Sequence, residues 1–287
     1  MSVELITRLN DGHPFLGRQA PDLGLSRPAL RSMLRHHEAR RVLHGVYVDA
    51  SRSDDRELRA EALHLVMPSY GVLFGTTAAW LFGIDAFQPE ERFVLTPTCV
   101  VPHGAARPTG NGIRAVEGYI AATDITEING LRTTTPGRTA ADLLRRLRRP
   151  FAMSSADALA RAELISIGDL RERIDRLRGY PGIIQARELL PLINPRAESP
   201  GESWQRLRLI DAGFPAPQVQ YAVIDHRGRV LARLDLAYES IRLGTEYDGA
   251  PFHSHDSDVR RDAERREFLG QAFGWRFVIA RGGHPGP

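Results

Sequence analysis

Apolar side chains recur along this sequence with helical spacing in some stretches and in short extended runs in others. Helical spacing is found in seven stretches before residue 195: residues 17–23, 29–36, 56–66, 76–82, 139–147, 154–165 and 168–177. Short extended runs predict strands at residues 92–96 and 113–117, and two more on either side of Gly45. This mixture of helices and strands predicts an α/β protein, α+β overall.

From residue 199 onward the pattern predicts a helix, three strands, a long helix and a last strand. The six stretches are residues 199–212, 218–224, 230–237, 242–247, 256–273 and 275–280. Ser199 is the expected N-cap of the first helix, and Glu202 stands at the capping-box position three residues later. Asp225 to Gly228 is typical of a hairpin turn between the first two strands. The predicted order is therefore αβββαβ.

Turn residues divide the sequence into three expected domains. Residues 1–50 contain a helix, a turn at Gly24, a second helix with Ser26 as candidate N-cap, and two strands. That order is typical of a winged helix-turn-helix. Residues 51–197 form a mixed α/β middle domain, and Pro195 and Pro200 mark the boundary to residues 198–287.

Composition limits the classes of protein that remain. The 287 residues are 42% hydrophobic with a formal net charge of +3, which suits a folded chain with a sizeable core. The single Cys99 excludes an intrachain disulfide and a multi-cysteine metal site, and it fits a reducing cytoplasm. The uncharged residues 62–84 contain proline, serine and glycine, so we expect buried helices there and no membrane span. Residues 1–10 lack the apolar core of a signal peptide.

All 38 basic residues are arginine, so no catalytic lysine is available. Five arginines cluster near the first predicted strands: Arg27, Arg31, Arg35, Arg40 and Arg41. Glu38 is the one acidic residue between them, which leaves a local positive field suited to the phosphates of double-stranded DNA. The alternative is a small helical cap with a solvated charged face.

Two acidic residues stand out in the C-terminal strands. Asp235 interrupts an otherwise apolar strand, and Glu246 lies near the end of the next one. A buried carboxylate costs several kcal/mol unless donors or a cation meet it. If the strands pair, both acids meet at one edge of the sheet, and Asp248 shares the face of Glu246. Carboxylates of this kind suit Mg²⁺ or Mn²⁺, which activate water against a phosphodiester. Glu202 is either a further acid of this site or simply a helix cap.

The middle segment carries little chemistry. His103 is the one possible reactive group, and a loop histidine without a partner is more often structural or solvated. We therefore expect residues 51–197 to connect, to pack, or to bind a protein partner.

Several motifs of the last 85 or so residues occur in an order that resembles a known group. They are Ser199–Ser203, Ala232–Ala237, Glu246–Gly249, His253, Arg260–Asp262 and Gly274–Arg276. They look like the endonuclease-like domains related to very-short-patch-repair enzymes, in the PD-(D/E)XK superfamily. The resemblance implies a restriction-endonuclease-like fold in which Asp235 and Glu246 bind Mg²⁺ or Mn²⁺.

The same resemblance implies roles for further residues. Arg260, Arg261 and Asp262 would contact the substrate or order the site, with Arg261 closest to the chemistry. Asp248 stands where the superfamily has lysine, and Glu-x-Asp-Gly is the usual pattern of the subfamily that this chain resembles. His253 or an arginine would then supply the missing polar group.

A second resemblance covers most of residues 1–195. Residues 15–18 and 45–48, with residues 75–83 and 134–143, look like AbiEi-type antitoxins and transcriptional regulators. This implies a winged-helix DNA-binding module, a middle antitoxin-like domain and possible pairing with a toxin. Two hypotheses follow: a Mg²⁺-dependent DNA endonuclease, or a non-catalytic repressor that binds operator DNA. The sequence leaves the choice, the toxin and the oligomeric state open.

Overall fold

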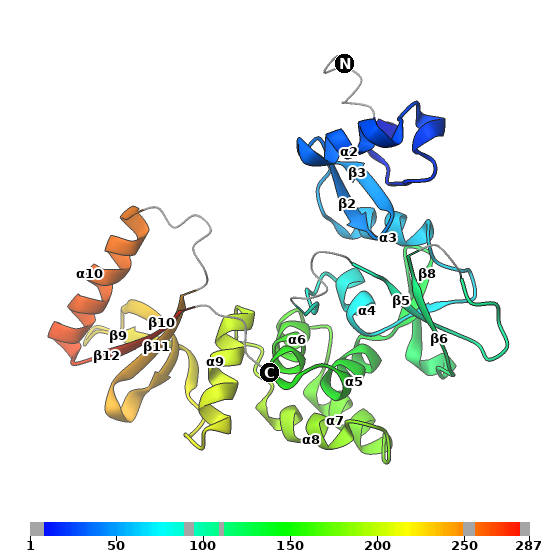
Figure 1. Ribbon diagram of the computed structural model, residues 1–287. Helices are drawn as coiled ribbons and strands as arrows, with labels where there is room; N and C mark the ends of the chain where they lie inside the picture. Colours follow the sequence, from blue (N-terminus) through cyan, green and yellow to red (C-terminus); the bar gives the residue numbers. More distant parts are fainter. Residues whose placement is uncertain (1–8, 89–94, 109–111, 249–255, 282–287) are drawn as a thin grey trace. The chain divides into compact units, whose positions relative to one another are not determined.

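The computed structural model of this protein describes residues 9–88, 95–108, 112–248 and 256–281 (Figure 1). The chain divides into two compact units, residues 1–142 and residues 143–287. Helices and strands occur in both units, which confirms the predicted mixture of α and β structure. No helix in these described ranges combines the length and the apolar composition that a membrane span requires.

The first part of unit 1 is a small module of 3₁₀ turns, an α-helix and a three-stranded sheet (Figure 1). Its elements are η1 (Leu9–Gly12), β1 (Phe15–Leu16), η2 (Ala20–Leu23), α2 (Arg27–Arg35), β2 (Ala39–Leu43) and β3 (Val46–Asp49). Strand β3 lies in the centre and is antiparallel to both neighbours. Gly45 joins β2 to β3 with a left-handed backbone (φ +75°), so the predicted strand pair is confirmed.

Helix α2 begins where its capping residues predicted. The Ser26 hydroxyl accepts a hydrogen bond from the backbone N–H of Ala29 at 3.2 Å, and Pro28 lies in the first turn. Leu30 and Met33 are buried on one side of the helix. Their spacing fixes which face of α2 packs on the module and leaves the opposite face in solvent.

The helix predicted for residues 17–23 is wrong, because only the short 3₁₀ turn η2 forms there. The backbone N–H of Gly17 donates to the carbonyl of Gly45 at 2.9 Å, so Gly17 is bound to the β2–β3 turn instead of a helix. Gly24 then ends η2 with a left-handed backbone (φ +74°).

The rest of unit 1 is a mixed five-stranded sheet with helices packed on it (Figure 1). The sheet order is β6-β5-β4-β8-β7. The elements are α3 (Arg56–His64), β4 (Val72–Leu73), α4 (Gly75–Leu81), β5 (Thr98–Val101), β6 (Arg114–Glu117), η3 (Ala122–Asp124), β7 (Ile125–Ile128), β8 (Leu131–Thr134) and α5 (Pro136–Arg146). The predicted helices and the strand near residue 113 are confirmed. The strand predicted for residues 92–96 falls partly outside the described residues, and the next strand starts only at Thr98.

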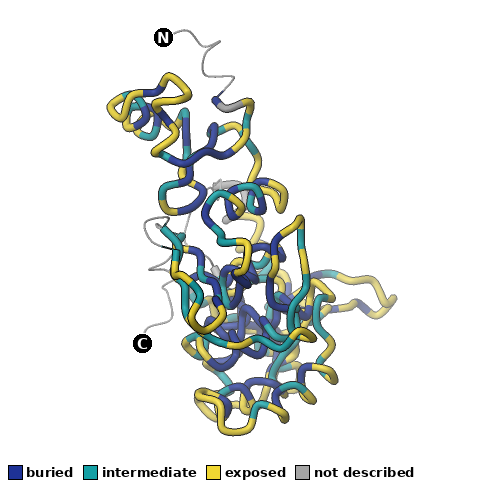
Figure 2. The backbone as a smooth tube through the Cα atoms, turned by 90° about the vertical axis from the view of Figure 1, so that its right-hand side faces the viewer, coloured by how far each residue is buried: buried dark blue, intermediate teal, exposed yellow. Residues whose placement is uncertain are grey.

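One hydrophobic core runs through both parts of unit 1. Leu16, Val42 and Val46 of the N-terminal module belong to the same buried cluster as Leu58 and Trp80. In Figure 2 such buried positions are dark blue. The N-terminal strands are therefore one packed body with the helices that follow them.

Unit 2 contains helices followed by a four-stranded sheet (Figure 1). Its elements are α6 (Arg149–Arg161), α7 (Ile167–Arg176), α8 (Ile183–Leu189), η4 (Leu190–Leu192), α9 (Pro200–Asp211), β9 (Gln218–Ile224), β10 (Val230–Tyr238), η5 (Glu239–Ile241), β11 (Leu243–Asp248), α10 (Asp256–Phe273) and β12 (Arg276–Arg281). The predicted αβββαβ order from α9 to β12 is confirmed. The sheet order is β12-β11-β10-β9, with β11 and β12 parallel and the other pairs antiparallel.

Candidate functional site

Helix α2 carries a line of exposed arginines. Arg27, Arg31 and Arg35 occur at every fourth position and all three are exposed, opposite the buried Leu30 and Met33. None of the three forms an ion pair or a side-chain hydrogen bond with another described residue. Their guanidinium groups thus face solvent and are available to an anionic partner.

The two remaining arginines of the cluster lie on strand β2 and behave differently. Arg40 is half-buried and donates a hydrogen bond from Nη2 to the carbonyl of Arg52 at 2.8 Å. Arg41 is exposed, with its guanidinium 5.9 Å from the centre of the Tyr47 ring. The structure thus brings Arg41 to the solvent side of the module, whereas Arg40 supports the backbone.

At the start of α9, Glu202 is largely a capping residue. The Ser199 hydroxyl accepts from the Glu202 backbone N–H at 3.2 Å and donates to Glu202 Oε1 at 2.9 Å. The backbone N–H of Glu198 and the side-chain amide of Gln220 donate to Glu202 Oε2 at 3.0 and 2.8 Å. This is the predicted capping arrangement, and it also ties α9 to strand β9.

Asp235 and Glu246 lie on paired antiparallel strands, as the pattern predicted. The ladder between β10 and β11 ends at the pair of Leu236 and Thr245, and Asp235 and Glu246 are the next residues beyond that pair on the two strands. The backbone N–H of Tyr247 donates to Asp235 Oδ2 at 3.2 Å. The pKa of Asp235 is raised to about 6, chiefly by burial, with smaller contributions from the charges of Glu202 and Glu246, while this hydrogen bond and Arg265 oppose the rise. Asp235 therefore lies within the electrostatic influence of two other carboxylates.

Two arginines of α10 hold Glu246. Arg265 donates to Oε1 and Arg266 donates to Oε2, both at 2.9 Å. Glu246 is only 8% exposed, so both of its oxygens are used inside the protein by charge-assisted hydrogen bonds. The sequence reasoning chose Arg260 and Arg261 for this site and missed Arg265 and Arg266.

This arrangement does not present the open oxygens that Mg²⁺ or Mn²⁺ would need. Guanidinium groups already face both oxygens of Glu246. Within the ranges that the structure describes, no group of three or more acidic, histidine or cysteine side chains is placed to hold a metal ion. Metal binding by Asp235 and Glu246 stays a prediction.

The other predicted site residues are more scattered. Arg260, Arg261 and Asp262 are exposed on α10, and Asp262 pairs with Arg265 at 3.3 Å. His253 and the side chain of Asp248 lie outside the described residues.

His103, the possible reactive group of the middle segment, is part of a small surface ion cluster. Its Nδ1 lies 3.6 Å from Glu117 Oε2, and Arg107 pairs with Glu117 at 2.9 Å. The hydrogen bond from Arg107 lowers the pKa of Glu117. His103 and Arg107 are both exposed, which fits the solvated role that was expected of this histidine.

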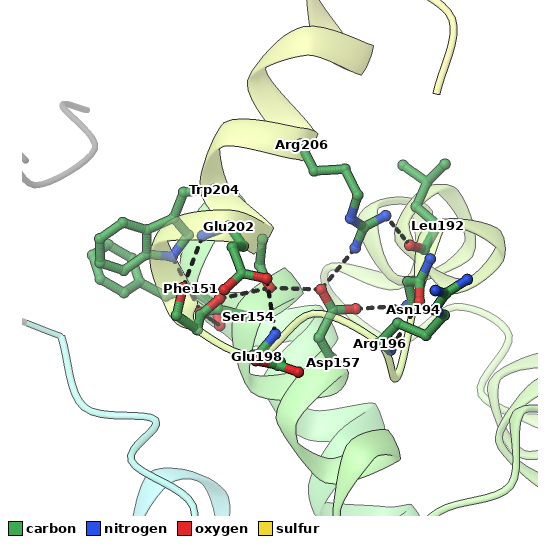
Figure 3. A network of polar contacts seen from close by, with 12 residues as sticks. Phe151, Ser154, Asp157, Leu192, Asn194, Arg196, Glu198, Glu202, Trp204 and Arg206 are labelled. Carbon is green, nitrogen blue, oxygen red and sulfur yellow. Dashed lines mark hydrogen bonds and ion pairs between the residues drawn. The ribbon is translucent and has the colours of Figure 1, made fainter. Parts of the chain in front are cut away.

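A buried ionic network between α6 and α9 was not foreseen from the sequence (Figure 3). Asp157 of α6 accepts from Arg206 Nη2 and from Ser203 Oγ, both at 2.7 Å, and from the backbone N–H of Asn194 at 2.8 Å. Both charged side chains are at most 5% exposed. Burial raises the pKa of Asp157, and the charge of Arg206 opposes the rise. A lone acid in a helix of mostly small apolar residues was the available signal.

Trp204 of α9 adds contacts to helix α6 and to strand β11, and Figure 3 shows it beside Phe151 and Ser154 of α6. Its indole N–H donates to Ser154 Oγ at 3.2 Å, and its ring packs edge-on against Phe151 of α6 and Tyr247 of β11. Gly201 lies against the Tyr247 ring so closely that a Cβ would stand 2.1 Å from a ring carbon. Helix α9 is thus fixed on one side to α6 and on the other to the C-terminal sheet.

Comparisons with known proteins point to one family. Residues 70–192 match the AbiEi antitoxin C-terminal domain. Two proteins of Mycobacterium tuberculosis are 34% identical over 238 residues, which is 83% of this chain and 83% of each relative: the uncharacterized protein MT2308 of strain CDC 1551 / Oshkosh and the uncharacterized protein Rv2248 of strain ATCC 25618 / H37Rv. The crystal structure of RV2827C protein from Mycobacterium tuberculosis covers 78% of this chain and 87% of its own. Its TM-score against this chain is 0.35, and the sequence identity is 16%.

Proposed function

We propose that this chain, which belongs to the same family as the mycobacterial proteins MT2308 and Rv2248, is a non-catalytic AbiEi-type antitoxin that represses transcription by binding operator DNA. The observation that carries the proposal is the match of residues 70–192 to the AbiEi antitoxin C-terminal domain. The N-terminal module, with the exposed arginines of α2, precedes that region in the chain. This order fits a DNA-reading module followed by an antitoxin domain.

The element order of the N-terminal module supports a winged helix-turn-helix. A short strand, a helical turn, a capped helix and an antiparallel strand pair follow one another from β1 to β3, and β1 pairs with β3. In such modules the second helix enters the major groove and the strand pair forms the wing. Helix α2 takes the place of the recognition helix, and Gly45 takes the tip of the wing.

The exposed arginines then have defined tasks. Arg27, Arg31 and Arg35 line the solvent face of α2, where they reach base edges or backbone phosphates of duplex DNA. Arg41 reaches a phosphate beside the wing. Each phosphate contact releases condensed counterions, so binding must weaken as salt rises.

Fluorescence anisotropy with a duplex from the upstream region of the gene tests this proposal. The double variant Arg31→Ala/Arg35→Ala should weaken binding and flatten the dependence of log K on log salt by about one unit per lost phosphate contact. The matched control, Arg171→Ala/Arg187→Ala, removes the same charge from the exposed faces of α7 and α8. Equal losses in both double variants would contradict a role for α2 in recognition and reduce the effect to net charge.

A cognate toxin is the second proposed partner. The match to an antitoxin domain supports it, because antitoxins are defined by the toxin that they counteract. Expression of a toxin encoded next to this chain should arrest growth, and co-expression of this chain should relieve the arrest. Relief that is lost with the Arg31→Ala/Arg35→Ala variant indicates protection through repression, and relief that persists indicates protection through residues 70–192.

A metal-dependent DNA endonuclease of the PD-(D/E)XK type is the second candidate function. The specific observation that favours it is that Glu202 of α9 and Glu246 of β11 lie close enough to Asp235 of β10 for their charges to help raise its pKa. The αβββαβ order also fits the resemblance to very-short-patch-repair-like domains. Purified protein with Mn²⁺ should then nick plasmid DNA, and Asp235→Asn should abolish both nicking and Mn²⁺ binding. Unchanged DNA binding in chelator with no cleavage under any divalent ion would leave only the regulator.

A further inference from the structure

A small pocket lies at the base of the β2–β3 turn in unit 1. Its volume is about 170 Å³, and its lining comes from three separate segments of chain: Leu16, Gly17, Arg18, His44, Gly45, Tyr47 and Gly112. All of them belong to unit 1. The polar side chains in this lining are an arginine, a histidine and a tyrosine, and none of the lining residues that the structure describes is acidic.

The pocket is built by close backbone contacts at two glycines. The backbone N–H of Gly17 donates to the Gly45 carbonyl at 2.9 Å, which clamps the end of β1 to the turn. A Cβ at Gly17 would stand 2.8 Å from the Tyr47 ring, and one at Gly112 would stand 2.7 Å from the His44 carbonyl oxygen. A side chain at either position would have to displace a wall of the pocket.

The charges around the pocket favour an anion. Arg18 and His44 line it and are exposed to solvent, and the guanidinium of Arg41 lies 5.9 Å from the centre of the Tyr47 ring that forms one wall. Arginine pairs with phosphate in a planar, two-pronged geometry, and tyrosine and histidine supply further donors. Positive groups without a lining acid concentrate negative ligands.

The volume decides the size of that ligand. Pockets for drug-sized molecules measure about 300–1,000 Å³, so this one is too small for a whole nucleotide. A water molecule takes about 30 Å³ of liquid, so the pocket has room for roughly five waters, which is enough for one tetrahedral phosphate and its hydration.

We propose that this pocket binds a single phosphate group through Arg18, His44 and Tyr47. The phosphate has two possible sources, a free phosphate ester and the backbone of bound DNA; the second rests on the proposed DNA-binding function. In both cases the ligand contacts Gly17 and Gly45, where β1 meets the β2–β3 turn, so its binding should stiffen that turn.

The test is a calorimetric titration of the full chain with inorganic phosphate and with glycerol phosphate. The unmodified protein should bind both, and Arg18→Ala and His44→Ala should each lower the affinity roughly tenfold or more, as expected for a lost charge-assisted hydrogen bond. Gly17→Ala should have the same effect by pushing the Tyr47 ring toward the pocket. The control Arg132→Ala removes an exposed cation of strand β8, outside the pocket lining, and should change nothing.

DNA binding of the same variants distinguishes the two sources. If phosphate competes with duplex DNA and Arg18→Ala weakens both, the pocket takes a backbone phosphate. If Arg18→Ala abolishes phosphate binding and leaves DNA affinity unchanged, the pocket takes a free phosphate ester. Phosphate binding by a protein that binds no duplex refutes the proposed function and leaves the pocket proposal intact. Absence of heat with millimolar phosphate, together with unchanged DNA affinity in folded Arg18→Ala and His44→Ala, overturns it.

Discussion

The buried pair of Asp157 and Arg206 should dominate the stability of unit 2. The substitution Asp157→Asn keeps the shape of the side chain and removes its charge. Arg206 is then left as a buried cation without its counter-charge, since the residue is only 4% exposed. Breaking one partner of such a pair costs about 3–5 kcal/mol, a large part of the stability of an ordinary domain.

Three hydrogen bonds converge on the carboxylate of Asp157, from Arg206, Ser203 and the backbone of Asn194. An asparagine retains one acceptor oxygen and turns the other into a donor, which faces either Arg206 or the backbone N–H of Asn194. The loss therefore includes repulsion as well as a missing charge, which places the expected cost toward the upper part of that range.

An exposed ion pair of nearly equal length provides the matched control. Arg233 pairs with Glu198 at 2.9 Å, with side chains 57% and 44% exposed. Glu198→Gln removes a charge in the same way, but solvent screens the pair, so the cost should be about 0–1 kcal/mol. A double variant, Asp157→Leu/Arg206→Met, replaces the buried pair by apolar side chains and should recover most of the lost stability.

Urea unfolding followed by tryptophan fluorescence measures these differences. Trp204 and Trp275 both lie in unit 2, and a Trp80→Phe background removes the tryptophan of unit 1. The units need not unfold together, so the transition of this background, which reports on unit 2, is the one to compare. Equal losses in Asp157→Asn and Glu198→Gln would refute the reasoning, because burial would then have no effect on the energy of the pair.

Two further predictions concern the C-terminal sheet. The pKa of Asp235 is raised to about 6, so the folded protein binds this proton more tightly than the unfolded chain does. The protonated carboxyl therefore contributes fully to stability below about pH 4, and that contribution is lost as the pH rises through 6. The stability of Asp235→Asn relative to the unmodified protein should therefore rise between pH 4 and pH 7, by on the order of 1–2 kcal/mol after a discount for solvent screening. Urea unfolding at several pH values measures this difference, and a difference that does not change with pH would contradict the prediction. Gly201→Ala should destabilise the protein by about 1–3 kcal/mol, because the added Cβ would stand 2.1 Å from a carbon of the Tyr247 ring. In the control Gly168→Ala, in the first turn of α7, the added Cβ would meet only Ser166 Oγ at 3.6 Å, so this variant should be more stable by about 0.5–1 kcal/mol in thermal unfolding. An equal change in the two glycine variants would show that the Tyr247 contact has no influence.

Local signals in the sequence predicted many of the elements well. The long helix Asp256–Phe273 and the strand Gln218–Ile224 have the predicted bounds, and both serine caps hold their helices. The helix expected for residues 17–23 failed because Gly17 bonds to a turn that lies distant in sequence. Short strands such as Val72–Leu73 carry too few residues to show a period.

For the candidate site, the pairing of the two strands that carry Asp235 and Glu246 followed from the sequence pattern, whereas the partners of Glu246 did not. Leu269 is the buried anchor of α10, and Arg265 and Arg266 precede it by about one helical turn. That spacing would have directed attention to them, but which face of α10 packs on the sheet depends on tertiary contacts. The lone acid of α6 could have marked Asp157, but its partners lie far apart in sequence, so no local pattern could reveal them.

The core shared by the two parts of unit 1 also bears on how relatives of this protein can diverge. Val42 and Val46, beside the β2–β3 turn, are buried together with Leu58 of the following helix, whereas Arg27 and Arg31 are exposed. Exchanges along the outer side of α2 therefore carry little folding penalty, and the strands beneath tolerate few. We expect sequence differences between family members to gather on the exposed face of that helix, and chimaeras joined at residue 50 to aggregate unless the helices that complete the core are exchanged as well.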